Sequence, residues 1–454
     1  MNKNANSEFV KNSKNIFFIG IGGVSMASLA RFSMAAGKKV AGSDREESDA
    51  VRALEREGAR VFVGHRAENI DGCDLVVYTA AIKDDNPELV AARAGNIKTL
   101  SRAEFMGAIM ADCRVRIGVA GSHGKSSATA MISHVMLAAG KDPTVMCGAD
   151  IPEIGGACRI GEGAFLFEAC EYKDSFLSFS PNVAVILNVD HDHTDYFKTL
   201  DDVIRSFEKF AKISSDEGGS VVVCADDKGA ARATEGEFPI TYGIDAEADY
   251  KAVDVKMNGG FATFGVTFCD ELFLEKITLA VPGRHNIYNA LATVAVCDLI
   301  GIDRGVTAQA LGTFSGISRR FERRGNIGGA PIFVDYAHHP KEIEATLAAA
   351  REICKGKIIA VFEPHTYSRT KSLFDGFVKS FAAADKTIFT DIFAARETDT
   401  LGVSSKMLAE AAGGEYAPSY EDAARRVAEL ARDGDIVLIL GAGTVVRIAD
   451  ILGG

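Results

Sequence analysis

Arg-Val-Arg-Ile-Gly-Val-Ala-Gly-Ser-His-Gly-Lys-Ser-Ser, at residues 114–127, is the stretch that decides the fold of this chain. Its apolar first half predicts a buried strand, and Gly-Lys-Ser-Ser begins a helical segment that continues over residues 128–139. Glycines let backbone N–H groups close around phosphates, the lysine supplies a positive charge, and the next hydroxyl can bind Mg²⁺. The start of a helix adds partial positive charge. The stretch therefore predicts a nucleoside-triphosphate site.

The spacing of this loop differs from the usual P-loop. Four residues normally separate the two glycines, but Val119 stands where that spacing needs the first of them. The shorter form consists of Gly121, Ser122, His123, Gly124, Lys125, Ser126 and Ser127. This form indicates a different ATP-using family.

Composition limits the class of protein. A chain of 454 residues is too long for one core, so several domains are expected. No apolar run approaches the roughly 20 residues that cross a bilayer, and the polar N-terminus lacks a secretory segment. The net charge of −12 argues against nonspecific nucleic-acid binding. Nine dispersed cysteines without metal-type spacing predict reduced thiols in the cytoplasm.

The order of apolar and helical runs predicts three α/β units. These are a Rossmann-like unit at 1–112, a central P-loop-type unit with a mainly parallel sheet at 113–317, and a second Rossmann-like unit at 318–454. Residues 101–111 are interpreted as a link, and residues 250–281 as an antiparallel patch. Strands of the third unit are expected at 332–335, 357–362, 387–390 and 436–440.

A second glycine loop follows the first predicted strand. Gly20, Gly22 and Gly23 permit close approach of the backbone to a diphosphate, and Asp44 ends the next strand where a ribose-binding acid would stand. NAD and a uridine diphosphate both satisfy this pattern. The stretch Ser43–Ser48 also fits a solvated helix cap, and Ser43 and Asp44 can serve as both cap and binding residues.

Carboxylates follow two predicted strands of the central unit. Glu168 ends one of them, and the other leads into Asp190, His191, Asp192, His193 and Asp195. Because such groups can hold hard divalent cations, we expect a metal here beside the phosphate loop. The alternative is a polar loop with capping aspartates.

Further amide, cationic and imidazole groups lie at predicted element ends. Asn286 and Asn289 share one helix face and can either read an adenine edge or serve in capping and packing. Arginines at 319–320 can reach a phosphate or simply face solvent. Two strand ends of the third unit carry further site candidates, namely Asp335, Tyr336, His338, His339, His365 and Arg369. They indicate an anion site rather than zinc, because the spacing fits no known zinc pattern.

Taken in order, these motifs resemble the Mur ligase family over essentially the whole chain. The motifs are Gly20–Gly23 with Met26, Gly121–Ser127, Glu168–Glu171, Asn188–His193, Gly283–Asn289, Asp335–Pro340 and Phe362–Arg369. Residues 391–397 with Gly402-Val-Ser-Ser resemble the alanine-adding branch. Cys170 stands where many members carry an acid, and Thr366 where arginine is frequent.

The resemblance implies a ligase with ATP and Mg²⁺ as cofactors. It would join L-alanine to UDP-N-acetylmuramate through an acyl phosphate, with a UDP-sugar domain, a central ATPase domain and an amino-acid domain. Lys125 would contact the phosphates, and Mg²⁺ would be held by Ser126, Glu168 and His193. ATP would also be contacted by Asn286, Asn289, Arg320 and Asp335. The UDP-sugar would be bound by Gly20, Gly22, Gly23, Ser43 and Asp44, and the amino acid by Tyr336, His338, His365 and Arg369. We expect small-molecule partners only, with no nucleic acid or membrane insertion, and a monomer or homodimer.

Two other classes remain open at this point. An NAD-dependent oxidoreductase would use the first glycine loop but leave the second without a purpose. A non-catalytic nucleotide-binding subunit is disfavoured by intact Lys125, Glu168 and His193.

Overall fold

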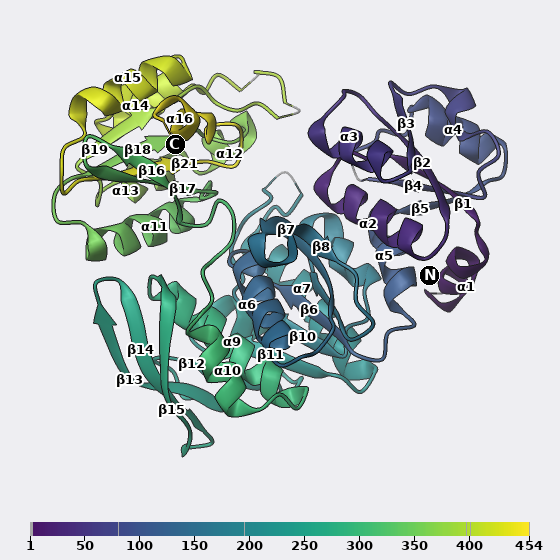
Figure 1. Cartoon of the computed structure of the whole chain (residues 1–454), viewed down its shortest axis with the longest axis horizontal. Helices are drawn as coiled ribbons and strands as arrows, with labels where there is room; N and C mark the ends of the chain where they lie inside the picture. Colours follow the sequence, from purple (N-terminus) through teal and green to yellow (C-terminus); the bar gives the residue numbers. More distant parts are fainter. Residues whose placement is uncertain (1–2, 80, 195, 396, 400, 454) are drawn as a thin grey trace. The chain divides into compact units, whose positions relative to one another are not determined.

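The computed structural model describes residues 3–79, 81–194, 196–395, 397–399 and 401–453 (Figure 1). The predicted site residue Asp195 lies outside these described residues, as does Arg396 of the alanine-branch motif. The chain forms two compact units, and each is α/β as predicted. The first comprises Met1–Asn188, Ile204–Val223 and Lys228–Ile240, and the second Val189–Val203, Cys224–Asp227 and Thr241–Gly454.

A five-stranded parallel sheet of Rossmann type begins the first unit, as predicted. Its strand order is β3-β2-β1-β4-β5, with β1 at Asn15–Ile19, β2 at Lys39–Asp44, β3 at Arg60–Val63, β4 at Leu75–Tyr78 and β5 at Lys98–Ser101. The helices are α1 (Lys3–Asn12), α2 (Val24–Ala35), α3 (Asp49–Arg56), α4 (Pro87–Ala94) and α5 (Arg102–Met110), with a 3₁₀ turn, η1, at Ala67–Ile70.

The interpretation of residues 101–111 as a link is wrong. They form α5, and Ser101 and Glu104 make a reciprocal capping box at its start. Most of the helix is buried, including Phe105 and Met110. Because this helix is apolar on several sides, its sequence lacks the 3.6-residue alternation of apolar and polar residues that identifies an amphipathic helix.

A second set of strands in the first unit carries the phosphate loop. The order is β11-β10-β6-β9-β7-β8, parallel except for β8. The elements are β6 (Arg116–Ala120), α6 (Lys125–Ala138), β7 (Thr144–Ile151), η2 (Pro152–Ile154), β8 (Gly156–Arg159), β9 (Phe165–Glu168), η3 (Tyr172–Ser178), β10 (Val183–Ile186), α7 (Leu200–Asp216), β11 (Ser220–Cys224) and α8 (Lys228–Ala233). Because β6 lies between β9 and β10, the loop after β6 emerges between the two predicted acid-bearing strands.

The second unit contains the predicted antiparallel patch. It consists of β13 (Tyr250–Asn258), β14 (Phe261–Phe268) and β15 (Glu271–Pro282), preceded by β12 (Ile240–Gly243) and followed by α9 (His285–Leu299) and α10 (Arg304–Leu311). Figure 1 shows the three long strands side by side.

The C-terminal sheet of the second unit has the order β16-β17-β21-β18-β19-β20. Its strands are β16 (Glu322–Ile327), β17 (Ala330–Asp335), β18 (Ile358–Phe362), β19 (Lys386–Phe389), β20 (Glu415–Tyr416) and β21 (Ile436–Leu440). The antiparallel edge strand β16 was not predicted, because Glu-Arg-Arg-Gly-Asn-Ile is mostly polar and half-exposed. The parallel strands match the predicted ones closely.

Helices cover both faces of this sheet (Figure 1). They are α11 (Pro340–Ile353), α12 (Tyr367–Ser372), α13 (Phe374–Ser380), α14 (Ser405–Ala412), α15 (Tyr420–Leu430) and α16 (Arg447–Ile451). In β21, Val437 and Ile439 pack in one core with α15 and α16, whereas Leu438 and Leu440 pack in another with α11, α13 and α14. This alternation explains why β21 is a continuous apolar run.

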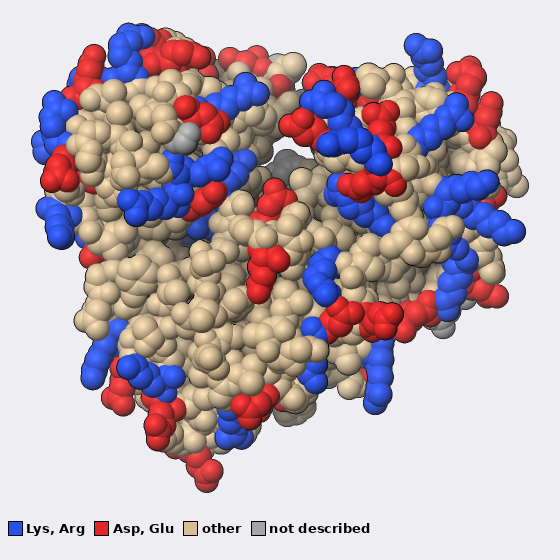
Figure 2. Space-filling view, viewed as in Figure 1, with Lys and Arg blue, Asp and Glu red and all other residues tan. Residues whose placement is uncertain are grey.

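The surface and thiols agree with the composition. Acidic and basic side chains are interspersed on the face shown in Figure 2. None of the helices in the described ranges combines the length and apolarity that crossing a bilayer needs. The nine cysteines, all within those ranges, are free thiols.

Candidate active site

The phosphate loop is held between β6 and α6 by glycine geometry and by one asparagine. Gly124, the N-cap of α6, has φ +82°, a left-handed conformation that favours glycine. Asn188, two residues after β10, accepts from the His123 N–H at 2.8 Å and donates to the His123 carbonyl at 3.0 Å. The Ser122 N–H donates to the Asn188 carbonyl at 3.1 Å. The loop backbone is therefore fixed to the neighbouring strand.

Lys125 begins α6 and points back across its own loop. Its Nζ donates to the carbonyls of Gly121 and Ser122 and to both oxygens of Glu171, at 3.0 and 3.3 Å. Glu171 is 1% exposed. Burial alone lowers the pKa of the Lys125 ammonium, but the Glu171 carboxylate outweighs this and raises the pKa above its usual value. The predicted phosphate ligand is thus fully charged.

Glu168 ends β9 beside this loop, and one of its oxygens is already engaged. Its Oε1 accepts from the Gly148 N–H at 2.6 Å and from the Cys147 thiol at 2.9 Å. Ser126, the first hydroxyl after Lys125, is buried. A carboxylate and a hydroxyl are hard oxygen donors, so these two side chains fit the few protein ligands that Mg²⁺ takes.

The structure does not test the predicted three-residue magnesium set. His193 belongs to the second compact unit, whereas Ser126 and Glu168 belong to the first. In the described ranges no group of three or more His, Cys, Asp or Glu side chains is arranged to hold a metal ion. Within the acid-rich loop, Asp190 pairs with Lys341 and Asp192 with Arg369.

The first glycine loop is built as the sequence predicts. The Gly20 N–H donates to the Ser43 carbonyl at 2.8 Å, and the Gly22 N–H donates to Asp44 Oδ2 at the same distance. A Cβ on Gly22 would lie 2.9 Å from that carboxylate oxygen and 3.0 Å from Val51 Cγ2, so any larger residue would have to displace these side chains. Gly23 is the N-cap of α2. The helix cap predicted within Ser43–Ser48 is confirmed, because Ser48 is the N-cap of α3 and its hydroxyl accepts from the Val51 N–H at 3.2 Å.

Ser43 faces the interior. Its hydroxyl donates to Glu88 at 2.7 Å, and this carboxylate, 0% exposed, also contacts His65 at 2.8 Å and accepts from Asn69 at 2.7 Å. The Ser43 side chain therefore belongs to a buried polar network, and it is the Ser43 carbonyl that accepts from the Gly20 and Ile21 N–H groups of the loop. Sequence reasoning missed Glu88 and His65, because nothing in the sequence pairs two residues 23 positions apart.

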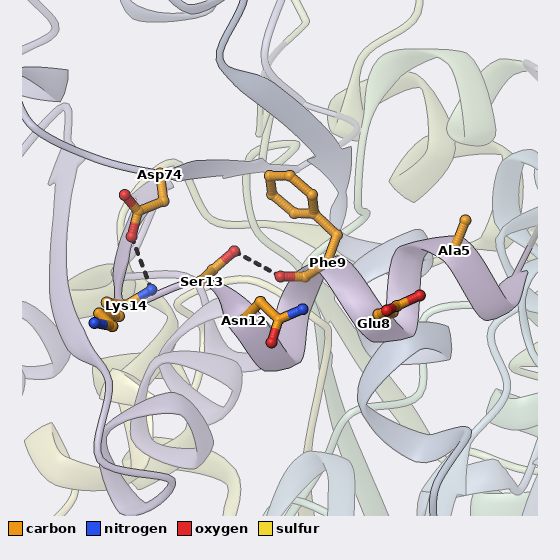
Figure 3. A pocket seen from close by; sticks show the side chains of 7 residues that line it. All are labelled: Ala5, Glu8, Phe9, Asn12, Ser13, Lys14 and Asp74. Atoms are coloured by element: carbon orange, nitrogen blue, oxygen red, sulfur yellow. Dashed lines mark hydrogen bonds between the residues drawn. The ribbon is translucent and has the colours of Figure 1, made fainter.

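The pocket drawn in Figure 3 lies elsewhere in the first unit. It is lined by Ala5, Glu8, Phe9, Asn12, Ser13, Lys14 and Asp74. Lys14 precedes β1 and Asp74 precedes β4, so the pocket is at the amino ends of these strands. The glycine loop is at the opposite edge, and ligands of open α/β sheets bind at the carboxyl ends.

Asn286 and Asn289 share one buried face of α9, as predicted. Asn286 donates to the Pro282 carbonyl at 2.7 Å, and Asn289 donates to Asn286 Oδ1 at 3.0 Å. Neither residue caps the helix, whose N-cap is Arg284. Of the two non-binding alternatives, packing is therefore present and capping is not.

The residues around the start of β16 and the end of β17 form one cluster. Both guanidiniums of Arg319 and Arg320 lie over the Tyr336 ring, with Cζ 4.9 and 5.1 Å from its centroid. Asp335 accepts from the N–H groups of Phe321 and Ala337 at 2.7 and 2.8 Å. Burial raises the pKa of Asp335 to about 6.

The predicted amino-acid residues are brought together. The rings of Tyr336 and His338 lie 5.3 Å apart, and those of His338 and His365 lie 5.9 Å apart. Arg369 contacts His365 Nδ1 at 3.3 Å and pairs with Asp192 at 2.9 Å. Burial lowers the pKa of His338 to about 3 and that of His365 to about 4, so both rings are neutral at pH 7. The cluster offers a cation beside two neutral imidazoles.

Family models match the chain in three consecutive segments. Residues 15–114 match the Mur ligase family, catalytic domain; residues 119–297 match the Mur ligase middle domain; and residues 319–443 match the Mur ligase, glutamate ligase domain.

Curated relatives and solved structures give the same result over nearly full length. The chain is 45% identical to the UDP-N-acetylmuramate–L-alanine ligase of Caldanaerobacter subterraneus subsp. tengcongensis, covering 96% of each chain. It is 43% identical to the ligase of that name from Clostridium novyi, covering 97% of each. The crystal structure of UDP-N-acetylmuramate–alanine ligase from Thermotoga maritima matches with a TM-score of 0.82 and 28% identity, over 97% of this chain and 98% of that one.

Proposed function

Because this chain belongs to the Mur ligase family, we propose that it joins L-alanine to the lactyl carboxylate of UDP-N-acetylmuramate in peptidoglycan precursor synthesis, with ATP converted to ADP and phosphate. One observation carries this proposal: a chain similar over nearly its full length to ligases of that name has a phosphate loop in which Lys125 is ion-paired and only 15% exposed. Residues 1–112 would bind the UDP-sugar, 113–317 ATP, and 318–454 the amino acid.

The chemistry follows from charge. A carboxylate is a poor acylating agent, so its oxygen first attacks the γ-phosphorus of ATP, and ADP leaves. The amine of alanine then attacks the acyl carbon of the acyl phosphate, and phosphate leaves. Lys125 and the partial positive charge at the start of α6 neutralise charge on the transferring group. Arg369 would hold the alanine carboxylate. Neutral His338, whose Nδ1 lies 3.0 Å from the Tyr336 carbonyl, would accept a hydrogen bond from the amine at Nε2.

Mg²⁺ would be held by Ser126, Glu168 and His193, and when bound it supplies charge neutralisation at the phosphates. Asn286, Asn289, Arg320 and Asp335 would contact the nucleoside and phosphate parts of ATP. Gly20, Gly22, Gly23 and Asp44 would receive the UDP-sugar, with Ser43 holding the loop through its backbone carbonyl. We place the protein in the cytoplasm, as a monomer or homodimer.

Phosphate release tests the proposal directly. The purified protein is given ATP, magnesium and UDP-N-acetylmuramate, with L-alanine, glycine or L-serine in turn. We expect release only when all substrates are present. No release with any amino acid would refute the proposal, and an NADH titration that saturates the first loop would favour an oxidoreductase instead.

A further inference from the structure

The charge balance of the phosphate loop depends on a residue to which no role has been assigned. Glu171 lies three residues beyond Glu168, at the start of η3, and is almost fully buried. Both of its carboxylate oxygens contact Lys125 Nζ, at 3.0 and 3.3 Å. The Lys125 side chain is itself only 15% exposed. The pair is therefore a buried ion pair inside the loop that is expected to bind a triphosphate.

Lys125 already uses its donors in this arrangement. An ammonium group has three protons, and the described acceptors around Nζ are the carbonyls of Gly121 and Ser122 and the carboxylate of Glu171. A phosphate oxygen that binds Lys125 must displace one of them. The carbonyls belong to the loop backbone, which Asn188 holds in place. Among these three acceptors Glu171 alone carries a negative charge, so it is the one that repels a triphosphate.

We propose that Glu171 is the counterion of Lys125 in the nucleotide-free protein and that the triphosphate takes Lys125 from it. Glu171 is then a positioning residue. It holds the ammonium aimed across the loop, at the expense of nucleotide affinity, because the two anions compete for one cation. The inference rests on the proposed function, which supplies the triphosphate.

Nucleotide affinity of the Glu171→Gln variant tests this. Glutamine keeps the size and a hydrogen-bond acceptor but removes the competing charge. We expect ATP in excess EDTA, measured by calorimetry, to bind roughly fivefold or more tightly than to the wild type. In turnover assays KM for ATP should fall without an equal rise in kcat. A merely structural role would weaken binding instead.

Two further variants complete the test. Glu162→Gln removes the same charge from an exposed position before β9, at the other end of that strand, and should bind ATP as the wild type does. Glu171→Asp keeps the charge but withdraws it by one methylene, so its affinity should lie between those of the wild type and Glu171→Gln. Thermal unfolding checks that each variant is folded.

The outcomes separate this inference from the proposed function. If the folded Glu171→Gln variant binds ATP no more tightly than the wild type, the inference is wrong although the ligase reaction stands. If that variant does not fold, weaker binding by Glu171→Asp than by the wild type would overturn it. A wild-type protein that binds ATP but releases no phosphate with its substrates would refute the function and leave this inference standing.

Discussion

At the residue scale, the pairing of Lys125 with Glu171 links stability to the phosphate site. Replacing Lys125 by Met leaves a buried carboxylate without its cation, which costs about 3–5 kcal/mol in similar pairs. We therefore expect Lys125→Met to lose ligase turnover and much of its free energy of unfolding in urea. The double variant Lys125→Met/Glu171→Gln should regain most of the stability but no turnover. Equal stability of the single and double variants would contradict the pairing.

Glu88 gives a second residue-scale prediction, in the Rossmann-like sheet. Removing its carboxylate leaves the Ser43 hydroxyl, His65 and the Asn69 amide without an acceptor they now share. We expect Glu88→Ala to lower the free energy of unfolding by about 2–4 kcal/mol. Glu68→Ala, in the exposed turn η1, should change it by less than about 0.5 kcal/mol. Similar losses in both variants would show that the buried network adds nothing.

At the element scale, strand β10 has an asparagine near each end, and the two asparagine side chains make different contacts. Asn182, before the strand, accepts from the Arg116 N–H at 2.9 Å, and Asn188, after it, clamps the phosphate loop. Each Asn→Ala change should cost about 1–2 kcal/mol of stability. Only Asn188→Ala should also raise KM for ATP, because only that end of β10 contacts the loop. A KM for ATP that rises equally in Asn182→Ala would argue against this assignment.

The ends of β17 and β18 predict a pH dependence of stability. Burial lowers the pKa of His338 to about 3 and of His365 to about 4, below the usual value of about 6.5. The unfolded chain therefore binds these protons first. Stability from the neutral rings is complete above about pH 6.5 and falls as the pH drops toward 4, by up to about 1.4 kcal/mol per unit for each ring.

The His338→Gln variant checks this slope. Urea unfolding at pH 7 and pH 5 should show that the wild type loses roughly 1–2 kcal/mol more on acidification than the variant does. The comparison uses the difference between two pH values, so any constant effect of the substitution cancels. Parallel losses in the two proteins would mean that His338 is not buried in its neutral form.

At the scale of the whole molecule, the order of the two chemical steps can be tested. With ATP and UDP-N-acetylmuramate present but alanine omitted, the acyl phosphate should accumulate on the protein. Hydroxylamine attacks acyl phosphates, so we expect a hydroxamate of the sugar acid, detected by mass spectrometry. Lys125→Met should form none. Full ligation without any trappable hydroxamate would contradict a stepwise reaction.

Much of the fold could be predicted from the sequence because the parallel strands are continuous apolar runs. β21 was placed exactly at 436–440, and the antiparallel patch near 250–281 was recognised from its alternation. The errors have a common cause. β16 is an edge strand with polar residues, and α5 is apolar on several sides, so neither shows the period that identifies its type.

Some residues of the candidate site could likewise be predicted from the local sequence, and others could not. Lys125 and the two glycine loops could be proposed as site residues because phosphate binding imposes a local spacing, and Glu168 because it ends a predicted strand. Glu171, Glu88 and Cys147 could not, because their partners lie 46, 45 and 21 residues away in the chain. The roles of Asn286 and Asn289 toward ATP stay predictions.

The amino-acid sequence alone determined the α/β class, the positions of the glycine loops and the Mur ligase resemblance, because each depends on residues that are near neighbours in the chain. Only the tertiary structure decided that Ser43 faces a buried carboxylate and that Lys125 is paired with Glu171. These outcomes depend on which charged and polar side chains are buried next to one another. Desolvation makes an unpaired charge so costly that packing, rather than local sequence, selects its partner.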